Sequence, residues 1–180
     1  MKKVAKQLQK FIDNQDVVKI ERDVTIGEAD ISGIIVQKSK NFLLIHDVEE
    51  FRFNGYALLK MDHIETLHCN KFQKIYYNIL KKEGILKKKS KQKLKLSNWK
   101  SVFSDLVGKD IHVIVECEDL KNPTFTIGPI VKITSKSVSV RNYDAFGKLD
   151  KIPTKINFKD ITLVRFGDRY STIFRKYLTK

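Results

Sequence analysis

The stretch SGIIVQKSKNFLLIHD, residues 32–47, has a counterpart later in the chain, IGPIVKITSKSVSVRN, residues 127–142. Each carries a glycine at its start, Gly33 or Gly128, followed by an apolar run, a polar turn and a second apolar run. Such runs, rich in β-branched residues and separated by turn residues, are typical of neighbouring β-strands. A glycine within a strand usually marks a bulge or a close backbone approach. The two stretches therefore predict the same pair of bent strands in each half of the chain.

The similarity extends outward on both sides of these stretches. Upstream, DVVKIERD (16–23) resembles DIHVIVECED (110–119), and downstream, NKFQKIYYNIL (70–80) resembles DRYSTIFRKYL (168–178). The offset of about 94 to 98 residues indicates a duplicated unit with short loop insertions. We expect strands near 16–22, 30–37, 41–47, 56–60 and 63–69 in the first half, and near 110–117, 124–133, 136–142, 151–158 and 160–166 in the second. Turn signals such as FNGY (53–56) and YDAFGK (143–148) separate the strands.

Apolar residues at helical spacing mark both ends of each half. These positions are Val4, Leu8, Phe11 and Ile12, then Phe72, Ile75, Tyr76 and Ile79, then Trp99, Val102, Phe103 and Leu106, and finally Tyr170, Ile173, Phe174 and Leu178. Ser97 or Asn98 is expected to cap the third helix, and Gly108 is expected to end it.

Five short strands at this spacing are expected to curl into a small barrel, because an open sheet would leave its edges unpaired. The expected fold class is mainly β with short helices, as two tandem five-stranded barrels that are each flanked by helices. We place the first helix-plus-barrel repeat at residues 1–84, a basic joint at 85–97 and the second repeat at 98–180.

The stretch GIIVQKSKNFLLIHD (33–47) resembles the first motif of Sm proteins, which runs glycine, apolar strand, turn, apolar strand and acid. The stretch ITLVRFGDRYSTI (161–173) is similar to the second Sm motif, although Arg165 and Gly167 are separated by one residue where Sm proteins have an adjacent Arg-Gly pair. The NGY turn (54–56) also resembles uncharacterised bacterial proteins with this turn before the fourth strand. The resemblance implies tandem Sm-like barrels that bind RNA or protein.

The net charge of +14 is concentrated in the middle of the chain. Residues 1–70 carry a net charge of −1, residues 71–100 carry +10, and residues 101–180 carry +5. Localised positive charge is typical of proteins that bind polyanions. The densest lysines are Lys87, Lys88, Lys89, Lys91, Lys93 and Lys95. They predict either contact with nucleic acid or a solvated linker. If residues 89–96 are extended, their alternating pattern would place Leu94 and Leu96 opposite the lysines.

The sequence contains no recognisable catalytic or cofactor motif. There is no P-loop, dinucleotide-binding glycine pattern or nucleophile elbow. His63 and Cys69 would share one strand face while His68 points to the other, so we expect no metal site. Cys69 and Cys117 fit a reducing, cytoplasmic setting as buried thiols. We therefore expect no enzyme, no cofactor and no small-molecule substrate, and the absence of a long apolar run predicts no membrane span.

Aromatic residues beside basic ones suggest where nucleic acid would bind, because exposed rings stack on bases. Phe51, Phe53 and Tyr56 lie before the fourth strand of the first half, and Tyr143 and Phe146 occupy the matching loop of the second. The alternative is that these rings close the barrel ends.

The function expected from the sequence is therefore a non-catalytic binding module for nucleic acid, with RNA favoured. The alternative is a protein-interaction or assembly scaffold that binds a protein partner or self-associates. The candidate nucleic-acid-binding residues are Lys87, Lys88, Lys89, Lys91, Lys93, Lys95, Arg141, Tyr143, Phe146, Lys148, Arg165 and Arg169.

Overall fold

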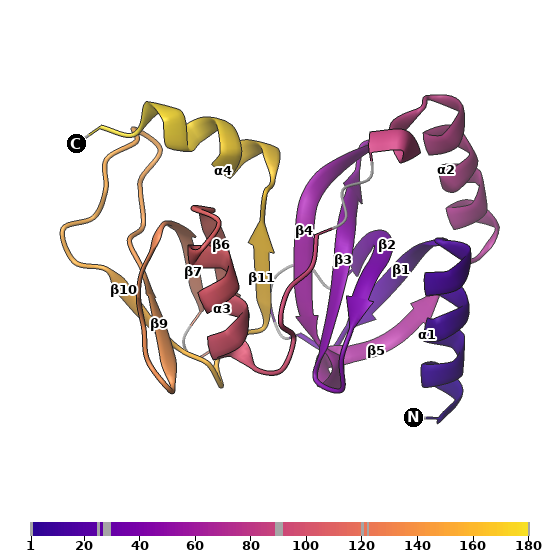
Figure 1. Cartoon of the computed structure of the whole chain (residues 1–180), viewed down its shortest axis with the longest axis horizontal. Coiled ribbons are helices and arrows are strands. Elements are labelled where there is room, and N and C mark those ends of the chain that lie inside the picture. Colours follow the sequence, from indigo (N-terminus) through magenta and orange to yellow (C-terminus); the bar gives the residue numbers. More distant parts are fainter. Residues whose placement is uncertain are drawn as a thin grey trace. The chain divides into compact units, whose positions relative to one another are not determined.

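The chain divides into two compact units, Met1–Lys93 and Leu94–Lys180, in which antiparallel strands predominate over short helices (Figure 1). The mainly β fold class is confirmed. The boundary between the units falls inside the predicted joint, 85–97. The computed structural model describes residues 2–24, 26, 30–88, 92–119, 121 and 123–179, with the backbone alone at residues 2–6 and 88. Within these ranges, none of the helices has the length and apolar character that a membrane crossing requires.

Unit one begins with a helix, continues as antiparallel strands and closes with a second helix. Its elements are α1 (Lys2–Asn14), β1 (Val17–Arg22), β2 (Asp30–Lys38), β3 (Phe42–Glu49), β4 (Arg52–Lys60), the 3-10 turn η1 (Met61–His63), β5 (Ile64–His68), α2 (Lys71–Lys82) and the 3-10 turn η2 (Ile85–Lys88). The strand order is β5-β1-β2-β3-β4, with neighbours antiparallel. Helix α1 packs against β2 and α2 against β1.

Unit two repeats this sequence of elements with shorter strands. Its elements are α3 (Trp99–Val107), β6 (Val113–Cys117), β7 (Thr124–Gly128), β8 (Ile130–Ile133), β9 (Ser137–Val140), β10 (Thr154–Asn157), β11 (Leu163–Phe166), α4 (Arg169–Phe174) and the 3-10 turn η3 (Arg175–Tyr177). The order β11-β6-β7 is followed across Pro129 by β8-β9-β10. When β7 and β8 are taken as one strand that bends at this proline, the order matches that of unit one.

The strands form open sheets and not closed barrels. In unit one, β4 and β5 stand at opposite ends of the strand order, and no pairing joins them among the described residues. Register shifts between Ile35 and Gln37 and between His46 and Val48 bend the sheet, since a bulge increases local twist. The sequence pattern therefore predicted the strands and their curvature, but closure of each barrel is not seen.

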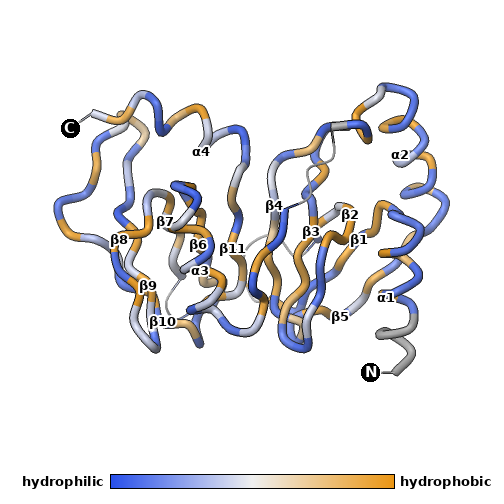
Figure 2. Tube along the Cα trace, in the orientation of Figure 1, coloured by the Kyte–Doolittle hydropathy of each residue, from blue (hydrophilic) through white to orange (hydrophobic). Residues whose placement is uncertain are grey.

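The cores lie on the inner faces of the strands, where hydrophobic colour concentrates along β3 and β6 (Figure 2). In unit one, Leu80 and Tyr76 of α2 pack on a cluster formed by Val17, Ile34 and Val48. In unit two, Leu178 and Phe174, each 98 residues further on, pack on a cluster formed by Ile114, Ile127 and Tyr143. The helical segments that end the two units therefore contribute residues at the same offset, Leu80 with Leu178 and Tyr76 with Phe174, to a cluster on the first strand pair of each unit.

Local sequence signals explain how the helices begin. The Asn98 side chain accepts a hydrogen bond from the backbone N–H of Ser101, and Gly108 follows the last turn of α3, so both predicted ends are confirmed. Asn70 and Gln73 form a reciprocal capping box at the start of α2. A capped start fixes where the α2 side chains meet the sheet.

The prediction of a turn at FNGY (53–56) was wrong. The turn lies at Glu50 and Phe51, which both have positive φ, and β4 already runs through Asn54 and Gly55. Gly55, with φ +77°, instead absorbs the register shift between β3 and β4. Asn-Gly pairs supply positive φ to bulges as readily as to hairpin turns, so the sequence alone did not distinguish the two.

Gly33 and Gly128 occupy equivalent, crowded positions. They pair with Val18 and Val113 respectively, at the same 95-residue offset that separates the two glycines. A Cβ on Gly33 would lie 2.5 Å from the carbonyl oxygen of His46, and a Cβ on Gly128 would overlap the carbonyl oxygen of Arg141, again 95 residues further on. Gly128 also has a φ of +155°. The close backbone approach predicted from the sequence is confirmed in both units.

Replacing Gly128 by valine should lower the free energy of unfolding by roughly 1–3 kcal/mol, because the side chain would collide with backbone and require an unfavourable φ. Urea denaturation followed by circular dichroism measures this change. The control is Gly108→Ala, since a Cβ there would have no neighbour nearer than 3.7 Å. An equal midpoint for the native protein and Gly128→Val would show that the approach is unimportant.

We propose that each unit folds alone, so fragments 1–93 and 94–180 should each melt cooperatively. A fragment that begins at residue 97 should be less stable than 94–180, because it lacks Leu94 and Leu96, two side chains with exposures of 4% and 6%. Loss of buried leucines costs about 2–5 kcal/mol each. Thermal melts compare the three fragments. Equal stability of fragments 94–180 and 97–180 would contradict the assignment of Leu94 and Leu96 to the core of unit two.

Candidate nucleic-acid interface

The loop that follows β9 is held closed by one aspartate. The Asp144 carboxylate accepts hydrogen bonds from the backbone N–H groups of Phe146 (2.9 Å) and Lys148 (3.0 Å), and Tyr143 forms a β-bridge with Leu149. Asp144 is therefore a turn residue, as predicted. The turn places Phe146 at its tip, where the ring is 88% exposed.

The C-terminal segment runs beside this loop. Lys148 forms a parallel bridge with Thr179, whose backbone N–H donates to the Gly147 carbonyl oxygen at 2.8 Å. Gly147 has a φ of +80°, and a Cβ there would lie 3.0 Å from the carbonyl oxygen of Tyr177. The loop and the segment are therefore in backbone contact, and Tyr177 is 71% exposed beside them.

A row of stacked rings leads from the core of unit two to its surface. Tyr143 stacks on Phe174 with 5.3 Å between ring centroids, and Phe174 stacks on Tyr170 at 5.1 Å. Tyr143 is buried and Tyr170 is 54% exposed. The inner rings fix α4, and the outer ring is left with a face available for stacking.

Basic residues lie next to these exposed rings in the sequence. Lys148, Arg169 and Lys176 are all exposed, and residues 141–179 carry a net charge of +5. Asp168, the buried N-cap of α4, accepts hydrogen bonds from the backbone N–H and the hydroxyl group of Ser171. Asp144 and Asp168, two of the four acidic residues in 141–179, therefore both accept hydrogen bonds from nearby backbone N–H groups. We call Phe146, Lys148, Arg169, Tyr170, Lys176 and Tyr177 the aromatic-basic surface.

Three predicted residues do not belong to this surface. Tyr143 is 3% exposed, and burial raises the pKa of its hydroxyl group, so the ring packs in the core as the alternative interpretation proposed. Arg165 forms an ion pair with Glu116 at 2.5 Å across β11 and β6. Arg141 is partly buried, and its backbone N–H bonds the Pro129 carbonyl oxygen. Of the loop and helix residues predicted, Phe146, Lys148 and Arg169 are exposed.

The structure describes only some residues of the predicted lysine tract, Lys87 to Lys95. Lys87, Lys93 and Lys95 are exposed, and the Lys95 backbone N–H donates to the Asp105 carboxylate at 2.7 Å. Leu94 and Leu96, which the alternation placed opposite the lysines, are buried, so this end of the predicted joint is not a solvated linker. The side chain of Lys88 and the whole of Lys89 and Lys91 lie outside the described residues.

Sequence reasoning missed Tyr170, Lys176 and Tyr177. Tyr170 was assigned to the apolar face of the last helix, which is correct for Phe174 but not for Tyr170. The sequence RYSTIFRKY (169–177) did indicate that some of these rings would be exposed. Each aromatic residue in it has a basic neighbour, and the helix is too short to bury every ring.

No metal-binding group of three or more histidine, cysteine or acidic residues occurs among the described residues. Cys69 and Cys117 are free thiols. The aromatic-basic surface therefore consists of exposed rings and cations.

Comparison of the chain with protein-family models, with curated proteins and with solved structures finds no match.

Proposed function

We propose that the protein is a non-catalytic, cytoplasmic binding module for single-stranded nucleic acid, with RNA favoured. The observation that carries the proposal is the aromatic-basic surface, where Phe146, Tyr170 and Tyr177 are each more than half exposed among basic side chains. Exposed rings offer faces on which bases can stack, and base stacking is worth about 1–3 kcal/mol per base. Basic side chains nearby would contact the phosphates.

The fold that would carry this function is a duplicated Sm-like unit. The equal strand orders, the paired glycines Gly33 and Gly128, and the matched packing of Leu80 and Leu178 support a duplication. Divergence then explains why the strands and loops of the first unit, residues 1–70, carry a net charge of −1 whereas residues 101–180 carry +5. The lysine tract would add affinity without sequence preference, because lysine heads are point charges with little geometric selectivity.

The second candidate function is a protein-interaction or assembly scaffold. It rests on one observation: helices α2 and α4 expose apolar side chains at equivalent positions, Phe72 with Tyr170 and Ile75 with Ile173. A defined oligomer that is unchanged by nuclease treatment would favour this function. Nucleic acid that copurifies and is released by a high-salt wash would favour the first.

Replacing Tyr177 and Phe146 together by alanine should weaken binding of a fluorescent oligouridine by about 1–3 kcal/mol per lost stack, which is at least tenfold in affinity. Fluorescence anisotropy at low salt measures the dissociation constant. The matched control is Phe125→Ala, which removes a ring that is 64% exposed on β7 and belongs to neither the loop nor the C-terminal segment. If the control weakens binding as much as the double variant, the stacking surface has been placed wrongly.

Changing the tract to glutamine should flatten the salt dependence of binding. If about four of its lysines neutralise phosphates of a single strand, the tract should contribute about −3 to the slope of log K against log salt. The glutamine variant should lose this contribution. The six positions are Lys87, Lys88, Lys89, Lys91, Lys93 and Lys95. Anisotropy titrations at several salt concentrations test this. An unchanged slope would identify the tract as a linker.

A further inference from the structure

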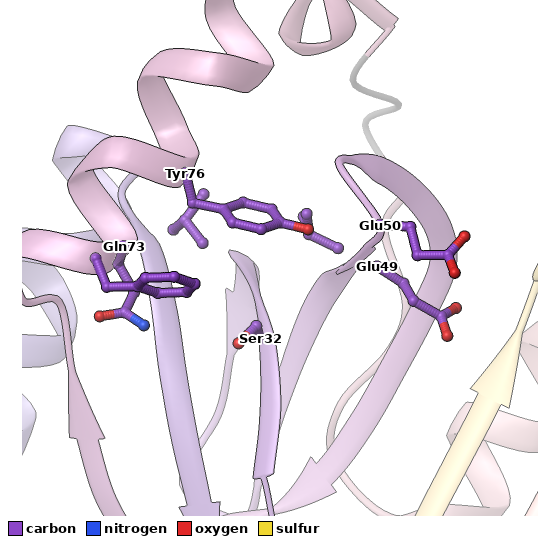
Figure 3. A pocket seen from close by; sticks show the side chains of 8 residues that line it. Ser32, Glu49, Glu50, Gln73 and Tyr76 are labelled. Carbon is purple, nitrogen blue, oxygen red and sulfur yellow. The ribbon is translucent and has the colours of Figure 1, made fainter.

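Unit one contains a pocket of about 120 Å³ between the start of α2 and the turn that joins β3 to β4 (Figure 3). It is lined by Val17, Ser32, Val48, Glu49, Glu50, Phe72, Gln73 and Tyr76. Cofactors and metabolites usually occupy pockets of about 300–1,000 Å³. This volume instead suits one side chain of a larger partner.

One end of the pocket presents a hydrogen-bond donor on a side chain that is mostly buried. Gln73 is 4% exposed, and its Oε1 accepts from the backbone N–H of Asn70 at 3.1 Å in the capping box. This bond fixes the orientation of the amide, so Nε2 lies on the side that faces Ser32 (Figure 3). Among the described residues, Nε2 has no hydrogen-bond partner. The pocket therefore offers an N–H group to a ligand oxygen.

The middle of the pocket is apolar and held in place. The Tyr76 hydroxyl oxygen accepts from the Phe51 backbone N–H at 2.7 Å, and the two rings stack with 4.4 Å between centroids. Phe72 contributes a second ring, 65% exposed, and Val17 and Val48 complete the floor. Such a surface takes a chain of methylene groups, and its rings attract a cation that passes over them.

The opposite end is acidic. Glu49 and Glu50 stand where β3 ends, and both carboxylates extend beyond the pocket and away from the Tyr76 ring (Figure 3). Glu50 already pairs with Arg52 at 2.8 Å. The Glu49 carboxylate accepts from the Asn54 amide at 2.6 Å, and no basic side chain contacts it among the described residues. This end of the pocket therefore favours a positively charged group.

We propose that this pocket binds a lysine or arginine side chain of a partner polypeptide. The backbone carbonyl oxygen of that residue accepts from Gln73 Nε2, its aliphatic stem lies over the Tyr76 and Phe72 rings, and its cationic head reaches Glu49. A donor, an apolar floor and an acid in this order match the carbonyl, methylene stem and cation of a basic residue. The acidic rim disfavours phosphate, so this site is distinct in chemistry from the aromatic-basic surface.

The test follows the Gln73 side-chain amide by NMR while acetyl-Gly-Arg-Gly-amide is added to the full chain. We expect saturable shifts with a dissociation constant on the order of millimolar. Glu49→Gln and Phe72→Ala should each weaken binding by about two- to fivefold. Glu65→Gln and Phe125→Ala remove an exposed acid and an exposed ring elsewhere and should leave the affinity unchanged.

A second peptide, in which citrulline replaces arginine, keeps the shape and removes the charge. It should bind at least threefold more weakly than the arginine peptide. Equal binding of the two peptides, equal shifts of the Gln73 amide with oligouridine, or no saturable shift would each overturn the proposal. If the glutamine substitutions in the lysine tract move the Gln73 amide without any peptide, the occupant is this chain's own tract and the proposed partner is wrong.

Discussion

Each unit depends on one close approach, in which a glycine Cα lies against a carbonyl oxygen of the next strand. At Gly33 the oxygen belongs to His46, and at Gly128 it belongs to Arg141. No side chain fits between them, so strands β2 and β3, and likewise β7 and β9, can draw together and bend. Bending lets short strands cover one apolar cluster, which the terminal helix or turn then closes through Leu80 or Leu178.

The same frame carries two different surfaces. In unit one the region where α2 meets the strand ends is rimmed by Glu49 and Glu50, and in unit two the corresponding region presents Tyr170, the counterpart of Phe72, next to Arg169. Side chains outside the cores are not constrained by the bent sheet, so they could diverge in charge while the packing stayed the same.

Much of the fold could be predicted from the sequence, because strands, caps and glycines leave local signals. Asn98 as a cap and Gly128 as a crowded strand position are examples. The binding surface was harder to predict, because exposure is decided by tertiary packing. Tyr143 and Phe146 share one loop, yet the first is buried and the second is 88% exposed. The sequence alone suggested that Arg165 could contact phosphate. In the structure β11 pairs with β6, and Arg165 forms an ion pair with Glu116.

Ultraviolet crosslinking of the full chain to oligouridine, followed by mass spectrometry of the joined peptides, tests whether the aromatic-basic surface binds single-stranded nucleic acid. Stacked bases crosslink to the rings that hold them, so we expect crosslinks within the peptides that carry Phe146, Tyr170 and Tyr177. Crosslinks confined to Phe72 and Tyr76 of unit one, or the absence of any crosslink at low salt, would show that this surface does not bind nucleic acid.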